Sequence, residues 1–330
     1  MSEWYEIKDI KKWIKEGKKT NLIINVLAIN SNKKINELMM DIYDLTNLHS
    51  LCLYNCGLVL IDAYIEKLVN LTFIELRANC IELIPENICK LTKLIQLILP
   101  FNKISNIPNS INNLINLTTL DLSNNQIDFI PDSLYKLTNL EILSLSSNKI
   151  KSISNKIYQL TNLKEISFGF NKITNLPETI GKLDKLEMVC FESNKILIIP
   201  ESFYELVNLT NMNFDSNKLT HISSKISKLY KLNLIKLTNN KIISIPDSLF
   251  ELENLKILDL KKNKIKVLSE NIILLKKLEF LDISTNQIVK IPNNFISRCA
   301  KLKLDDFKYD EHLIELELNP NPNHIRKQDE

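Results

Sequence analysis

The sequence predicts an α/β repeat protein, a solenoid in which short strands stack into one parallel sheet and short helical or irregular segments cover the other side. The main observation is a leucine that recurs every 23 residues without a slip and starts the same phrase each time: Leu45, Leu68, Leu91, Leu114, Leu137, Leu160, Leu183, Leu206, Leu229, Leu252 and Leu275. Copies in one register, at a period typical of solenoids, indicate units that bury their apolar side only against neighbouring units.

The second observation is the pattern inside each copy, for which residues 137–153 (LTNLEILSLSSNKIKSI) are a clear example. Leu140, Leu143 and Leu145 have the spacing of a short strand whose inward side chains stack on those of the next copy. Strands stack about 4.8 Å apart, whereas the opposite side of each unit carries bulkier backbone. The unequal widths predict a curved molecule with the strands on its concave face.

This phrase, L-x-x-L-x-L-x-x-N-x-L, resembles the core pattern of the leucine-rich-repeat family. Tails such as residues 130–134 (IPDSL) are similar to the I/L-P-x-x-I/L ending of the typical intracellular class, which includes Ras-suppressor-like scaffolds and bacterial and viral effectors. The resemblance covers roughly residues 22–297. It implies a right-handed horseshoe, with a parallel sheet on the concave face, short helical or 3-10 segments on the convex face, and a role in binding proteins.

Two further positions of the repeat have a structural explanation. An asparagine in each copy predicts an inward ladder, because a carboxamide can satisfy backbone groups where the chain leaves the strand; these are Asn79, Asn102, Asn125, Asn148, Asn171, Asn194, Asn217, Asn240, Asn263 and Asn286, with Cys56 in the first clear copy. A proline in most tails predicts the start of a helical turn. Where it is replaced, by Asp62, Ser154, Ser223 or Ser269, we expect that side chain to cap the turn.

The ends of the chain depart from the repeat, and a solenoid needs caps there. Residues 1–20 predict an amphipathic helix, which is either a lid on the first repeat or a helix that binds a membrane surface or a partner. Residues 21–44 read as a degenerate first repeat, and residues 45–297 as the eleven regular ones. Arg298 stands where the next leucine is expected, so residues 298–330 are predicted to form a C-terminal cap and a loose tail.

Catalysis and cofactor binding have little support in the sequence. The chain has only 4 glycines and lacks phosphate-loop, nucleophile-elbow and zinc-helix motifs. Cys52 and Cys56 are four residues apart, but the repeat puts one on the concave face and the other in the ladder, so they should not share a metal. We therefore expect no enzyme, no cofactor and no metal site. A net charge of +3 is too small to imply nucleic-acid binding by itself.

The sequence also favours an intracellular, cytoplasmic monomer, in the host cytoplasm if the source is a virus or pathogen. The first residues are polar and acidic and do not resemble a signal peptide. No apolar run is long enough to span a membrane. The six cysteines are not arranged as paired disulfide caps at both ends, which favours free thiols.

The concave face is the predicted binding surface, since the outward side chains of its strands do not pack in the hydrophobic core. Its N-terminal third carries aromatic residues and an arginine, the usual anchors of interfaces; the candidates are Tyr54, Phe73, Glu75, Arg77, Gln96, Ile98 and Phe101. The alternative is that these residues reflect neutral drift on a solvent-exposed sheet and bind nothing, because single exposed apolar side chains are normal on protein surfaces.

A row of lysines that directly follow the ladder asparagine predicts a basic ridge along one edge of the horseshoe: Lys103, Lys149, Lys172, Lys195, Lys218, Lys241 and Lys264. One hypothesis is that the ridge binds an anionic surface or nucleic acid. The other is lysine-rich codon usage at a solvent position. Gln126 and Gln287 interrupt the row and the overall charge is nearly balanced, which weakens the nucleic-acid version.

Overall fold

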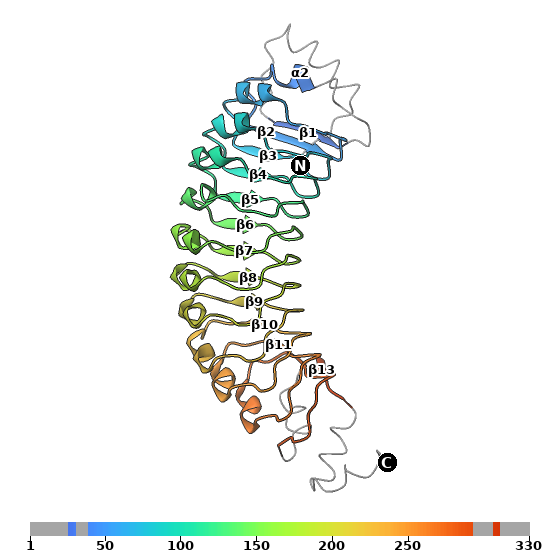
Figure 1. Ribbon diagram of the computed structural model, residues 1–330, viewed down its shortest axis with the longest axis vertical. Helices are drawn as coiled ribbons and strands as arrows, with labels where there is room; N and C mark the ends of the chain where they lie inside the picture. The colour runs from blue at the N-terminus through green and yellow to red at the C-terminus, as the bar shows by residue number, and fades with distance from the viewer. Residues whose placement is uncertain (1–25, 31–38, 293–305, 311–330) are drawn as a thin grey trace. The chain divides into compact units, whose positions relative to one another are not determined.

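The computed structural model describes residues 26–30, 39–292 and 306–310, which fall into two compact units, Met1–Lys172 and Ile173–Glu330 (Figure 1). Both units have the predicted architecture of stacked parallel strands and short 3-10 turns. The helix predicted for residues 1–20 lies outside the described residues, as do most of the degenerate copy at 21–44 and most of the cap at 298–330. Those domain boundaries stay predictions.

The first unit has seven strands that pair in parallel in chain order: β1 (Val26–Asn30), β2 (Ser50–Tyr54), β3 (Phe73–Glu75), β4 (Gln96–Ile98), β5 (Thr119–Asp121), β6 (Ile142–Ser144) and β7 (Glu165–Ser167). After the short helix α2 (Met39–Ile42), the strands alternate with the 3-10 turns η2 (Ala63–Lys67), η3 (Glu86–Lys90), η4 (Asn109–Asn113), η5 (Leu134–Lys136) and η6 (Asn155–Gln159). From β2 on, partner residues are 23 apart, as for Thr119 and Ile142. The leucine period is therefore the register of the sheet.

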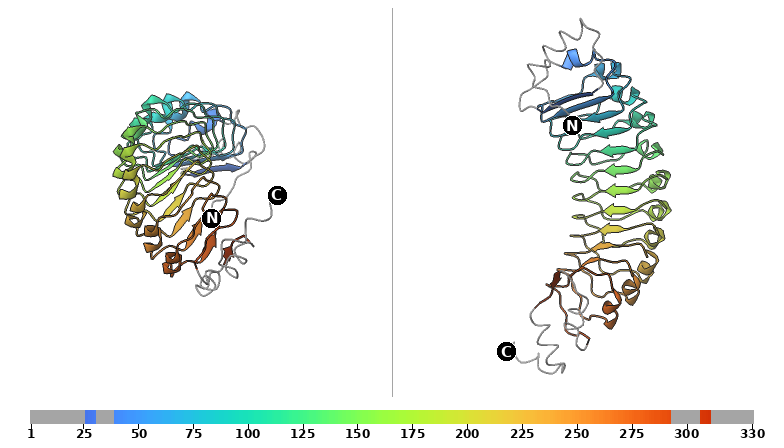
Figure 2. Two further views of the ribbon diagram at one scale, coloured as in Figure 1. Left: turned by 60° about the horizontal axis from the view of Figure 1, so that its bottom comes forward. Right: turned by 180° about the vertical axis from the view of Figure 1, so that it is seen from behind.

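The second unit continues the same alternation. Its strands are β8 (Met188–Cys190), β9 (Asn211–Asn213), β10 (Leu234–Lys236), β11 (Ile257–Asp259), β12 (Phe280–Asp282) and β13 (Asp306–Lys308), and its turns are η7 (Glu178–Lys182), η8 (Glu201–Glu205), η9 (Ser224–Lys228), η10 (Asp247–Glu251) and η11 (Glu270–Leu274). Phe280 of β12 pairs with Asp306 of β13, which lengthens the step to 26 residues after the repeat ends. In each unit the strands lie side by side and the turns follow the opposite margin (Figure 2).

The asparagine ladder is present as predicted. Asn148 is buried, its Nδ2 donates to the carbonyl oxygens of Leu122, Leu145 and Ser146 at 3.0, 3.0 and 3.2 Å, and its Oδ1 accepts the N–H of Ile127 at 2.9 Å. The same set of bonds recurs at Asn79, Asn102, Asn125, Asn171, Asn217, Asn240, Asn263 and Asn286. Each asparagine thus joins its own copy to the one before it.

The residue before each ladder position has a left-handed backbone conformation, which the sequence pattern does not predict. The φ angle at these non-glycine positions is between 52° and 58°: Asn55, Ala78, Phe101, Asn124, Ser147, Phe170, Ser193, Ser216, Asn239, Lys262 and Thr285. This conformation costs about 1 kcal/mol or more for a bulky side chain. The asparagines at 55, 124 and 239 tolerate it better than Phe101 and Phe170 do.

The turns begin as predicted in nearly every copy. Asp62, Ser154, Ser223 and Ser269 stand where other copies have proline, and each accepts the N–H of the residue two positions on. Pro131 is the exception among the prolines before turns, because η5 starts later and has Ser133 as its N-cap.

Three buried tyrosines complete this arrangement. The hydroxyls of Tyr43, Tyr135 and Tyr204 accept the backbone N–H groups of Asp62, Ser154 and Ser223 at 3.2, 3.3 and 3.2 Å. Those are copies in which proline is missing. Proline has no N–H, so its replacement creates a donor that must be satisfied. Burial raises the pKa of each tyrosine to about 12.

Candidate functional site

Seven side chains predicted to bind a partner lie on or beside three adjacent strands of the first unit, and we call them the N-terminal sheet patch: Tyr54, Phe73, Glu75, Arg77, Gln96, Ile98 and Phe101. In the sheet register Phe73 is beside Gln96, and Glu75 is beside Ile98. Neighbouring strands lie about 4.8 Å apart, so these pairs are in side-chain contact range. All four are half-buried, while the strand residues between them, such as Ile74, point into the core.

Arg77, Tyr54 and Phe101, the remaining members of the N-terminal sheet patch, lie near these pairs. The Arg77 Nε lies 3.3 Å from Glu75 Oε1, which orients an exposed guanidinium over the sheet. Tyr54 ends β2 and is half-buried. Phe101 is not on a strand: it is the left-handed residue before Asn102, and its ring is 54% exposed. The patch therefore combines apolar rings, one arginine and one carboxylate on a surface fixed by the ladder behind it.

The sheet surface of the second unit carries several carboxylates that bond neighbouring polar groups. Asp215 Oδ1 accepts the N–H of Thr238 at 2.7 Å, and Asn213 Nδ2 donates to Glu192 Oε2 at 2.8 Å. Burial raises the pKa of Asp215 to about 6, the Thr238 N–H lowers it, and the nearby Asp259 carboxylate raises it further. Asp215 therefore changes charge in the mildly acidic range.

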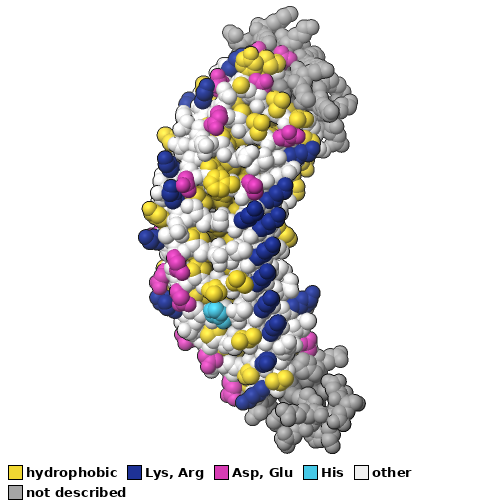
Figure 3. Space-filling view, in the orientation of Figure 1, with side chains coloured by type: hydrophobic (Ala, Val, Ile, Leu, Met, Phe, Trp, Pro, Cys, Tyr) yellow, Lys and Arg dark blue, Asp and Glu magenta, His cyan; other side chains and the backbone are white. Residues whose placement is uncertain are grey.

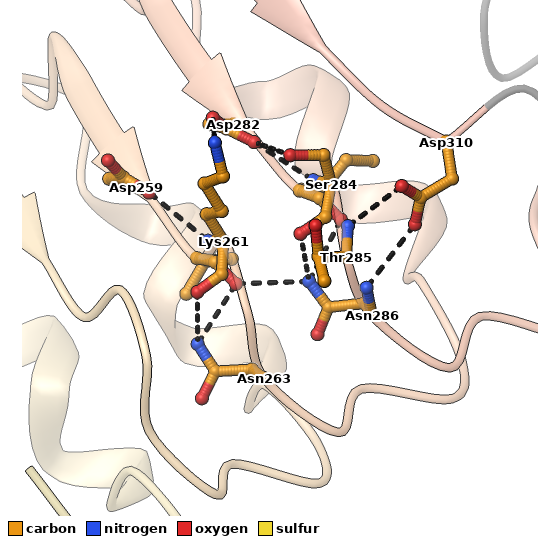
Figure 4. A network of polar contacts seen from close by, with 10 residues as sticks. Asp259, Lys261, Asn263, Asp282, Ser284, Thr285, Asn286 and Asp310 are labelled. Carbon is orange, nitrogen blue, oxygen red and sulfur yellow. Dashed lines mark hydrogen bonds and ion pairs between the residues drawn. The ribbon is translucent and has the colours of Figure 1, made fainter. Parts of the chain in front are cut away.

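A second polar network lies at the C-terminal end of this sheet (Figure 4). The buried Asp282 carboxylate accepts the N–H and hydroxyl of Ser284 at 2.9 and 2.5 Å, and Lys261 Nζ lies 4.0 Å from it. Asp310 accepts the N–H groups of Thr285 and Asn286 at 2.8 and 3.3 Å. The sequence analysis did not single out Asp282 or Asp310. Asp259 and Asp121 occupy the position of Asp282 in other copies and bond the backbone in the same way, whereas Asp310 lies after the last regular copy.

The seven lysines of the predicted ridge directly follow ladder asparagines in the chain, and all of them are exposed. The first unit holds Lys103, Lys149 and Lys172, and the second holds Lys195, Lys218, Lys241 and Lys264. The surroundings differ between the units. In the first, Gln126 interrupts the row and bonds Lys149, and Glu82 and Asp128 occupy the loops that follow the ladder. In the second, the corresponding loops carry no carboxylate, and sequence reasoning missed the exposed aliphatic side chains beside the lysines.

The described residues offer little for catalysis. They contain no group of three His, Cys, Asp or Glu side chains placed to hold a metal ion. Cys52 is half-buried on the sheet surface and Cys56 is buried in the ladder row, as the repeat predicts, and burial raises the pKa of Cys52. Within the ranges that the structure describes, no helix is both long and apolar enough to cross a bilayer.

Comparisons with known proteins agree with this geometry. A family model described as leucine-rich repeat matches residues 92–150, 115–173, 138–196 and 227–288, together more than half of the chain. No curated protein matches the chain in sequence.

Solved structures match over most of the chain. A leucine-rich-repeat protein of Leptospira interrogans is 27% identical with a TM-score of 0.76, over 94% of this chain and 88% of that one. A TDR receptor is 26% identical with a TM-score of 0.77, over 87% of this chain and 50% of the receptor. A plant peptide hormone receptor, RGFR1 in complex with RGF2, shares the fold at 24% identity and a TM-score of 0.68, over 88% of this chain and 50% of that one.

This chain thus spans about half the length of each of the two receptors. The repeat period, the asparagine ladder, the sheet with its 3-10 turns and the matching family model together show that the chain belongs to the leucine-rich-repeat family.

Proposed function

We propose that this protein is a binding scaffold whose partner is another protein, held on the N-terminal sheet patch. Members of the family generally act as non-enzymatic binding scaffolds, and the plant peptide hormone receptor RGFR1 was solved in complex with RGF2. The observation that carries the proposal is the grouping of Phe73 and Ile98 on the adjacent strands β3 and β4, with Arg77 and Phe101 just beyond the ends of these strands.

The composition of the patch favours a protein as the partner. Aromatic rings and arginine anchor protein interfaces, because they bury a large area at a low entropic cost and still form hydrogen bonds. The outward side chains of β5 to β7 include no aromatic residue and no arginine; they are Thr119, Asp121, Ile142, Ser144, Glu165 and Ser167. The first three regular strands therefore provide stronger anchors than the strands that follow.

An affinity capture from the native cell, repeated with variants, tests the proposal. We expect F73A/R77A/F101A to lose partners that the wild-type chain retains, with each hot-spot residue contributing about 1–4 kcal/mol to binding. T119A/S144A/S167A is the matched control, since it changes three outward sheet positions of the same unit, and it should retain them. If the first variant captures every partner as well as the wild type does, the site assignment is wrong.

We also propose that the protein works as a monomer inside the cell, in the cytoplasm. Cys52, Cys80 and Cys89 are free thiols, which is typical of reducing compartments. A native mass by light scattering and localisation of a tagged chain are the measurements. A dimeric mass or a secreted chain would contradict this part.

A further inference from the structure

The second unit carries a flank that is free of acidic residues and that the sheet-surface proposal does not use. It consists of the loops around each ladder asparagine, residues 193–200, 216–223, 239–246, 262–269 and 285–292, and we call it the lysine flank. These segments contain no Asp or Glu, while their lysines are Lys195, Lys218, Lys241, Lys262, Lys264, Lys266 and Lys290. The corresponding loops of the first unit include Asp62, Glu82 and Asp128.

The lysines of the flank also differ from other lysines of the same unit in their partners. Among the described residues, no ion pair joins a flank lysine to a carboxylate. In contrast, Lys225 and Lys228 lie 3.1 and 2.6 Å from Glu201 and Glu205 on the side of the 3-10 turns. The flank is therefore a region of uncompensated positive charge.

The backbone holds these charges in a fixed row. The N–H of Lys218 donates to the Ile196 carbonyl at 2.9 Å, that of Lys241 to Leu219 at 2.8 Å, and that of Lys264 to Ile242 at 2.9 Å. Hydrogen-bonded neighbours of this kind repeat about every 4.8 Å. Like charges at this spacing repel one another, and an anionic surface would relieve the repulsion.

Exposed aliphatic side chains lie beside the lysines. Leu197, Ile198, Ile243, Val267 and Val289 are between 48% and 57% exposed, and each follows a ladder asparagine within the same loop. On the face shown in Figure 3, hydrophobic side chains lie next to the basic side chains around the histidine in view. The flank therefore presents positive charge and exposed apolar surface together.

We propose that the lysine flank docks on an anionic lipid membrane. Lysine clusters bind acidic headgroups, and neighbouring aliphatic side chains gain free energy by entering the boundary between headgroups and acyl chains. Sites for single-stranded nucleic acid combine a basic groove with aromatic side chains on which the bases stack, and arginine adds to this stacking. The five segments of the flank contain no Phe, Tyr, Trp or Arg, so their chemistry fits lipid better than RNA.

Vesicle co-sedimentation of the full chain tests the proposal. We expect binding to phosphatidylcholine vesicles that contain phosphatidylserine, little binding to phosphatidylcholine alone, and weakening by salt. K218A/K241A/K264A should lower the partition coefficient about 100-fold, given the contribution of each lysine near an anionic surface. K225A/K228A/K256A is the matched control, since it removes three lysines of the same unit that are ion-paired, and it should bind as the wild type does.

A second variant separates the apolar contribution from the charge. I198S/I243S/V267S keeps every lysine and should reduce the binding that persists at high salt. The proposal is overturned if the chain does not bind anionic vesicles at low salt. It is also overturned if K218A/K241A/K264A and K225A/K228A/K256A lose vesicle binding equally, or if the flank lysines bind single-stranded RNA and not vesicles. F73A/R77A/F101A should leave vesicle binding unchanged, so this test does not depend on the N-terminal sheet patch.

Discussion

The ladder asparagine shows how one side chain determines the geometry of a copy. Asn148 satisfies three carbonyl groups and one N–H, from both its own copy and the preceding one. A buried polar backbone group without a partner costs about 1–3 kcal/mol. This cost explains why asparagine recurs at the position from Asn79 to Asn286 while outward strand positions vary.

Asp215 gives a prediction at the same scale. Its pKa is about 6 in the folded protein and 3.8 in a model peptide, so folding favours its protonated form. Well below pH 4 the Asp215 carboxyl is protonated in both the folded and the unfolded state, so its titration does not change the free energy of unfolding. As the pH rises from about 4 to about 6, the unfolded state loses the proton first and the free energy of unfolding falls. We expect D215N to raise the free energy of unfolding at pH 7.5 by about 1–2 kcal/mol, allowing for solvent screening at a partly exposed group.

The measurement is urea unfolding of D215N and the wild type across this pH range. The asparagine can still accept the Thr238 N–H, so the two proteins should be equally stable near pH 4. Because other carboxylates titrate in the same window, the difference between the two proteins is the quantity to follow. A difference that does not change with pH would show that Asp215 is ionised with an ordinary pKa.

At the scale of elements, the 3-10 turn is stabilised in two ways. Most copies have proline at the N-cap or shortly before it. Three of the four copies without proline have an N–H there, and the hydroxyl of a buried tyrosine 19 residues earlier accepts it. Ser269 has the N–H, but the residue 19 positions before it is Phe250, which has no hydroxyl. The copy at Ser269 therefore lacks the tyrosine that the other three non-proline copies have.

This leads to a paired prediction. Y135F should lower the free energy of unfolding by about 1 kcal/mol, and F250Y should raise it by about 0.5–1.5 kcal/mol, the usual contribution of one hydrogen bond. Thermal unfolding measures both. In a chain that carries S154P, the effect of Y135F should vanish, because the introduced proline has no N–H to satisfy. A loss that persists in the double variant would mean that the hydroxyl acts through another contact.

The elements also show what the sequence could and could not predict. The strands, the ladder and the caps at Asp62 and Ser154 follow from local spacing, so the repeat pattern was sufficient. The tyrosine bond could have been inferred from its coincidence with missing proline, but it joins two neighbouring copies and has no local signature. Likewise, strand register indicated the neighbours in the N-terminal sheet patch. Phe101 was expected on the strand face, but its left-handed backbone places it beyond the end of β4.

At the scale of the whole chain, an array of repeats must end somewhere, and its last copy lacks a successor. Within the second unit, the N–H groups of Asn239 and Asn240 donate to the carbonyls of Lys261 and Lys262 in the next copy. After the last regular copy, the Asp310 carboxylate accepts the equivalent N–H groups of Thr285 and Asn286 (Figure 4). One side chain thus takes over the role of two backbone carbonyls.

We predict that D310A loosens the C-terminal end of the sheet. Hydrogen bonds to charged groups contribute about 1.5–3 kcal/mol each, so amide exchange at Thr285 and Asn286 should accelerate at least tenfold. Stability in a repeat array depends on nearest neighbours, so amides of β2 to β4 should be unaffected. D310N retains one acceptor oxygen, so its amide exchange rates at Thr285 and Asn286 should lie between those of the wild type and D310A. Equal exchange rates in D310A and the wild type would contradict the assignment.

The regular offset between strands also bears on how such a gene can change length. Gln96, Thr119 and Ile142 are successive partners at intervals of 23 residues. If residues 119–141 were removed, Thr118 would join Ile142, and β4 would meet a strand with the same buried positions. Unequal recombination at equivalent codons can therefore add or remove whole copies without creating a new kind of interface. Loss of a single codon inside a strand would instead turn its buried residues outward.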